Sequence, residues 1–166
     1  GDDGIWVETQ KVVAWDRQAD SGGGDEDLDI WHYQDIDYGD LFGCSIGLSG
    51  DYMIVGAHNG DYNVDGLGGI SQAGAAYIFK RDAGVWEADQ KVVATIRGGW
   101  DRYGYSVAID SNVAVVGAKA EDHSEFEGAF LHNAGSAYIY TRDISGVWGA
   151  QTVSYTHLRA HETRGN

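Results

Sequence analysis

Short runs of apolar residues, separated by turn residues, organise this chain. At 77–79 and 138–140 two aromatic residues flank an isoleucine, and alternate residues of an extended strand lie on the same face. The runs 52–55 and 113–116 are apolar throughout, and each is followed by Gly-Ala, as expected of strands that are buried on both faces. No long segment shows the period of about 3.6 residues that is typical of an amphipathic helix. The pattern therefore predicts an all-β fold.

Two further strands and a set of turns complete the pattern. Residues 7–14 and 86–94 carry Trp and Val at strand-like positions. Gly, Asp, Asn and Ser favour tight turns. They gather between the predicted strands at 49–51, 82–84, 110–112 and 143–146. We therefore expect short antiparallel strands that are joined by hairpins.

Several of these segments occur twice. The pentapeptide Gln-Lys-Val-Val-Ala occurs at 10–14 and, letter for letter, at 90–94. Three other segments recur, each 61 residues later: 42–46 at 103–107, 54–57 at 115–118, and 73–79 at 134–140. A shared offset in three segments is evidence of an internal repeat. A repeated unit of four short strands is typical of the blades of a β-propeller.

The repeat divides the chain into five parts. They are an outer strand of a preceding or closing blade (1–14), an acidic Gly/Asp-rich insert loop (15–40), a first blade (41–95), a second blade with the start of the next strand (96–152), and a tail outside the repeat (153–166). The tail is interpreted either as translated adapter sequence or as a divergent C-terminus. Because two blades leave sheet edges exposed, we expect the chain to associate or aggregate when it is expressed alone.

Charge excludes some classes of partner. The chain has 26 acidic residues against 11 Lys and Arg, a net charge of −15. Nine of these acids lie in the insert loop 15–40, which has one Arg. Nucleic-acid binding needs clustered Lys and Arg, so we expect no nucleic-acid partner. No apolar run approaches the roughly 20 residues of a membrane span, so we expect no membrane insertion. A single cysteine, Cys44, excludes an intrachain disulfide and is expected to be a small buried residue.

The repeated segments resemble a known family. Phe/Tyr-Gly, then Val-Gly-Ala, then Gly-x-Ala-Tyr-Ile-Phe/Tyr is similar to the FG-GAP repeat, which builds the β-propeller of integrin α-subunits and of many bacterial and algal surface proteins. The resemblance covers roughly residues 5 to 148. It implies an all-β, FG-GAP-type propeller segment of about two four-stranded antiparallel blades from a larger ring, with further blades in the same chain.

The resemblance also implies a class of function. Members of the family are usually non-catalytic modules for adhesion or ligand binding, outside the cell or at its surface, and some accompany a hydrolase. We therefore expect a non-enzymatic module that recognises a protein or a carbohydrate through its loops. The alternatives are an accessory propeller of a larger secreted hydrolase and a lectin. A catalytic serine is disfavoured, because no base accompanies both Ser45 and Ser106 at a matching position.

A calcium loop is the first candidate site. Asp61, Asn63 and Asp65 precede Gly66 with the alternating spacing of oxygen ligands that can converge on Ca²⁺. The bidentate carboxylate that closes such a loop is missing, since Gln72 stands at that position. The calcium loop typical of the family, which lies between the FG and GAP segments, is absent from both copies. Calcium is therefore one interpretation of this loop, and a solvated Asx-rich turn is the other.

Aromatic residues in the variable segments are the second candidate site. Trp15, Trp31 and Trp100 lie in or near the segments that precede the two FG motifs. Exposed aromatic rings beside acidic groups can stack on sugar rings, which predicts a ligand or glycan site. The alternative is that these rings cover the sheets.

Overall fold

The computed structural model describes residues 8–15, 39–65, 69–124 and 130–150. These residues form ten β-strands and no helix. None of this part of the chain is therefore a helix that could span a membrane. The all-β prediction is confirmed.

The strands form two four-stranded antiparallel sheets. The first sheet has the order β1 (Ser45–Ser49), β2 (Tyr52–Ala57), β3 (Ala75–Asp82) and β4 (Val85–Val92). The second sheet has the order β5 (Tyr103–Asp110), β6 (Val113–Ala118), β9 (Ser136–Arg142) and β10 (Trp148–Ala150). A short hairpin of β7 (His123–Ser124) and β8 (Phe130–Leu131) lies between β6 and β9.

The two sheets are equivalent in their hydrogen bonds as well as in strand order. Arg81 N donates to Asp51 O at 2.8 Å in the first sheet, and Arg142 N donates to Asn112 O at 2.8 Å in the second. The partners in each pair stand 61 residues apart. The sequence repeat is thus a structural repeat of one blade-like unit.

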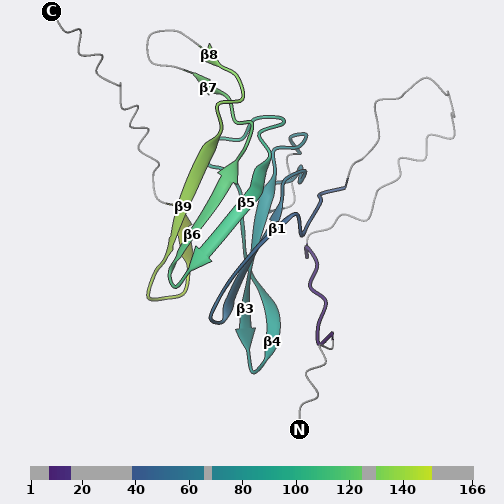
Figure 1. Ribbon diagram of the computed structural model, residues 1–166, viewed down its shortest axis with the longest axis vertical. Helices are drawn as coiled ribbons and strands as arrows, with labels where there is room; N and C mark the ends of the chain where they lie inside the picture. Colours follow the sequence, from purple (N-terminus) through teal and green to yellow (C-terminus); the bar gives the residue numbers. More distant parts are fainter. Residues whose placement is uncertain (1–7, 16–38, 66–68, 125–129, 151–166) are drawn as a thin grey trace, which may run out of the picture.

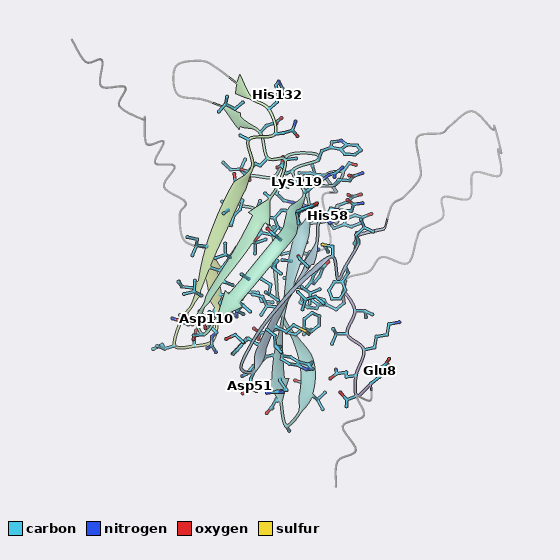
Figure 2. All side chains as sticks on the ribbon, viewed as in Figure 1. Glu8, Asp51, His58, Asp110, Lys119 and His132 are labelled. Atoms are coloured by element: carbon cyan, nitrogen blue, oxygen red, sulfur yellow. The ribbon has the colours of Figure 1, made fainter. Side chains whose placement is uncertain are left out.

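Two opposite ends of the sheets carry different connections. Figure 2 places His58 and Lys119 near one end and Asp51 and Asp110 near the other. The end with Asp51 and Asp110 carries the hairpin turns, which is where turn residues predicted them. We call the opposite end the loop end. It carries the long connections 58–74, 93–102 and 119–135.

An apolar layer fills the space between the two sheets. Alternate residues of β2 and β3 face the second sheet, where the aromatic rings of β9 meet them. The buried members of this layer are Tyr52, Ile54, Ala76, Ile78, Val92, Ala94, Tyr103, Ala114, Val116, Ala118, Tyr138, Tyr140 and Trp148. Residues predicted as aromatic fillers between neighbouring sheets therefore have that role.

Close backbone approach makes this layer thin. A Cβ built on Gly56 would lie 2.0 Å from the carbonyl oxygen of Gly104, and a Cβ on Gly104 would lie 2.1 Å from the carbonyl oxygen of Ala75. Gly104 also has a φ of +85°, which L side chains rarely adopt. The glycines of the two repeated motifs therefore bring β2 of one sheet against the start of β5.

A second apolar cluster lies on the other face of the first sheet. Val55, Tyr77 and Phe79 are buried there, and the segment 8–15 covers them with Val12 and Ala14. Figure 1 shows this order: the second sheet, the first sheet, and then the purple segment that contains residues 8–15.

Three expectations were wrong in detail. The predicted strand at 7–14 belongs to no sheet over its described residues 8–14, because no strand edge in the described part of the chain lies beside it. The run 113–116 is not buried on both faces: Val113 is 37% exposed, because nothing described covers that face of β6. Cys44 is exposed rather than buried, since it precedes β1 at the outer side of the first sheet.

Candidate binding site at the loop end

Two connections lie side by side at the loop end. Trp100 N donates to Ser71 O at 2.9 Å, and Arg102 N donates to Gln72 O at 3.1 Å. Gly74 and Tyr103 form a parallel bridge. The loop after β2 and the linker before β5 are therefore held together by backbone hydrogen bonds, and they form one surface.

Arg97 ties these two connections through its side chain. Its guanidinium donates to Asn63 Oδ1, and Nη2 donates to Asp61 O at 3.0 Å. Lys91 Nζ donates to Asn63 O at 3.0 Å. Burial lowers the pKa of Arg97 from its ordinary value, and the carboxylates of Asp61 and Asp101 oppose that shift. Two basic side chains thus converge on the loop that was predicted to bind calcium.

The carboxylate of Asp61 closes its own loop. Asp61 Oδ1 accepts a hydrogen bond of 2.6 Å from Gln72 N. In the second sheet, Asp122 Oδ1 accepts one of 2.7 Å from Asn133 N. Both pairs are related by the offset of 61 residues. The presence of an aspartate in both copies was the sequence signal for this shared structural role.

These contacts limit how calcium could bind. Oδ1 of Asp61 already accepts a backbone hydrogen bond, and Oδ1 of Asn63 already receives the Arg97 guanidinium. A cation at this loop would have to compete with that guanidinium. Within the described residues, no group of three or more His, Cys, Asp or Glu side chains could hold a metal ion. Gly66 lies outside the described residues, and calcium at Asp61, Asn63 and Asp65 stays a prediction.

The three candidate tryptophans have different positions. Trp100 is 56% exposed at the loop end, with a φ of 70°. Trp15 lies on the outer face of the first sheet, with its ring 5.0 Å from Tyr77 and 5.6 Å from Phe79 in edge-to-face contacts. Trp31 lies outside the described residues. The structure therefore brings Trp100, and not Trp15, together with the loop of Asp61 and Asn63.

A second cluster at the loop end was not predicted. Tyr105 lies between His58, whose ring is 5.2 Å away, and Lys119, whose Nζ is 4.5 Å from the Tyr105 ring. Burial lowers the pKa of His58, and the charges of Arg102 and Lys119 lower it further. The signal available in the sequence was that His58 and Lys119 occupy the same repeat position.

The serine that invited a catalytic interpretation has a structural contact. Ser45 Oγ donates to Gly104 O at 3.0 Å and so joins the two sheets. Buried hydroxyl groups do the same: Tyr103 OH bonds to Tyr140 OH at 2.6 Å, and Tyr140 OH donates to Val93 O. Burial raises the pKa of both tyrosines, and that of Tyr103 well above its ordinary value. These groups stabilise the contact between the sheets.

Comparison with protein-family models agrees with this repeat. The model of the FG-GAP repeat matches residues 34–79 and again 86–140, which is more than half of the chain. The chain belongs to the FG-GAP repeat family. The two matches end in β3 and in β9, the third strand of each FG-GAP sheet. A comparison with curated proteins found no match. The predicted family and the propeller-type fold of two four-stranded sheets are confirmed.

Proposed function

We propose that this FG-GAP propeller segment is a non-catalytic recognition module, and that its ligand, a protein or a carbohydrate, contacts the loop end. The exposed ring of Trp100 carries the proposal. Its linker is fixed by the backbone hydrogen bond to Ser71 and by Gly98 N, which donates to the carboxylate of Asp101. An aromatic ring on a fixed backbone loses little conformational freedom when it binds.

The surroundings of Trp100 support the same proposal. The side chains that differ between the two copies gather at this end, where Tyr105 and Lys119 stand at the positions of Cys44 and His58. The strands and their turns repeat, and such a scaffold tolerates variable loops that bind ligands. Membership of the FG-GAP family supports an extracellular or cell-surface location for the module.

Tryptophan fluorescence of the purified chain tests this function. We expect a panel of glycans and candidate protein ligands to change the emission, and Trp100→Ala to remove both the change and the binding. Ile96→Ala is the matched control, because Ile96 is a 73% exposed apolar residue of the same linker. Binding to glycans alone would favour the lectin form of the proposal. Equal loss of binding in both variants would contradict a role for the ring.

A further inference from the structure

The second sheet exposes a face whose counterpart in the first sheet is buried. Val113 is 37% exposed and Ile139 is 43% exposed. Their repeat equivalents, Tyr52 and Ile78, are 8% and 0% exposed because the second sheet covers them. We call this side of β5, β6 and β9 the rear face; it includes Val113, Val115 and Ile139.

The first sheet exposes the complementary half of the same contact. Ile46 and Leu48 on β1 are 62% and 63% exposed. Their equivalents, Val107 and Ile109, pack against the apolar layer between the two sheets. We call this side of the first sheet, with Ile46 and Leu48, the front face.

Backbone spacing shows the same relation. A Cβ on Gly104 would lie 2.1 Å from the first sheet, whereas at Gly43, its equivalent on the front face, a Cβ would meet no atom within 4 Å. Between the sheets, a Cβ on Gly47 would lie 3.3 Å from the backbone nitrogen of Ile109. At the equivalent position on the rear face, Ala108 lines an open groove of about 470 Å³ together with Val113 and Val115.

From these three observations we infer that the rear face of one copy docks on the front face of a second copy, head to tail, as the second sheet docks on the first. In this arrangement Leu48 of the second copy enters the groove beside Ala108, in the place that Ile109 takes beside Gly47. The two surfaces differ from each other, so the contact is heterologous and builds rings or open chains. This inference concerns assembly and is independent of the loop-end ligand.

The segment 8–15 already makes part of this contact within one copy. The side chain of Gln10 bonds to both N and O of Trp86, at 2.8 and 2.7 Å. The side chain of Gln90 bonds in the same way to N and O of Trp148, at 3.0 and 2.7 Å. Residues 8–14 thus occupy the place of a preceding sheet's outer strand, and the docking copy supplies the strands beside it.

Trp15 is the competitor for docking. Its ring covers Tyr77 and Phe79 on the front face, where the equivalent pair in the second sheet, Tyr138 and Tyr140, is covered by the first sheet. A docking copy must displace this ring. Removal of the ring should therefore strengthen association, an effect opposite to that expected for an apolar side chain within the new contact.

Charge sets a second signature. Each copy has a net charge of −15, so two copies repel each other at low ionic strength. Salt screens this repulsion and leaves apolar contacts in place. Association should therefore strengthen as sodium chloride is added.

Sedimentation velocity at chain concentrations up to about 100 μM measures the association. We expect concentration-dependent oligomers, weakened more than about tenfold by Ile139→Asp or Leu48→Asp because each would bury an unpaired carboxylate, and strengthened by Trp15→Ala. Ile144→Asp is the matched control, since Ile144 is an exposed apolar residue on neither face. A monomer at all concentrations and salt levels would overturn the inference. So would a loss in Ile144→Asp that equals the loss in Ile139→Asp.

Disulfide trapping tests the orientation and does not depend on affinity. In a Cys44→Ser background, chains with Leu48→Cys are mixed with chains with Ala108→Cys, and the mixture is oxidised. Head-to-tail docking predicts that the mixed disulfide exceeds either homodimer. An excess of the Ala108→Cys homodimer would indicate contact between two rear faces and would contradict the inference.

Discussion

The first and second sheets carry similar side chains at equivalent positions, yet these side chains have different surroundings. Ile78 is fully buried, whereas Ile139, 61 residues later, is 43% exposed. The difference arises because the second sheet covers Ile78, and nothing described covers Ile139. Burial in this FG-GAP chain is thus a property of the neighbouring sheet as much as of the residue itself.

The largest effect on this comparison is expected from the paired glycines of β2 and β6. Gly56→Ala places a methyl group 2.0 Å from the backbone oxygen of Gly104, so the sheets must separate, and the free energy of unfolding should fall by about 2 kcal/mol or more. In Gly117→Ala the nearest atom is the rotatable hydroxyl of Ser106, so the loss should be much smaller. Urea unfolding of both variants measures the difference; equal losses would contradict the close approach of the sheets.

The two glutamine contacts should differ by a smaller amount. Gln90→Ala removes both hydrogen bonds to the backbone of Trp148 in a partly buried place, and should lower the free energy of unfolding by about 1–2 kcal/mol. Gln10→Ala removes the equivalent bonds to Trp86, which are exposed, and should cost less. Thermal unfolding of the two variants provides the measurement. A larger shift for Gln10→Ala would show that segment 8–15 is the stronger of the two attachments.

Asp61 and its equivalent Asp122 separate the structural interpretation from the calcium interpretation. Asp61→Ala and Asp122→Ala should each lower the free energy of unfolding by about 1 kcal/mol, since each loses one carboxylate–backbone hydrogen bond. Because Arg97 lies at Asn63, we expect added Ca²⁺ to leave the melting temperature of the unchanged chain where it is. A rise with Ca²⁺ that disappears in the Asp61→Ala, Asp65→Ala double variant would instead establish the calcium site.

The smallest expected effect is the pH dependence at His58. Burial, with the charges of Arg102 and Lys119, lowers the pKa of His58 below 6.5. The folded chain then binds fewer protons than the unfolded chain, so the free energy of unfolding falls as the pH drops below about 6.5. His58→Gln should flatten this slope between about pH 5 and pH 7.5 in urea unfolding. Lys119→Met should reduce it, because one of the charges that lower the pKa is gone. An unchanged slope in both variants would contradict this assignment.

Much of this fold could be predicted because its signals are periodic. The constant offset between the two Val-Gly-Ala segments predicted two copies of one unit, and the turn residues at 82–84 and 110–112 predicted the hairpins. A tight turn depends mainly on its own residues, so local sequence was sufficient.

The candidate site was less predictable because its contacts are not local. Arg97 approaches Asn63 from a separate connection, 34 residues away, and no spacing rule contains such a pair. Trp15 and Trp100 had the same standing as exposed aromatics in the sequence, but one covers Tyr77 and the other lies at the loop end. Which loop a linker meets is decided by the packing of the sheets.

The amino-acid sequence alone was enough for the repeat, the strand order within each sheet and the family, because alternation, turn chemistry and an internal offset are all carried along the chain. Tertiary structure alone decided which face of each sheet is covered. Residues 8–14 and 90–94 hold the same pentapeptide; the described part of the first copy belongs to no sheet, while the second copy continues β4 as far as Val92. A strand needs a neighbouring edge to supply its hydrogen bonds, and only the fold provides that edge.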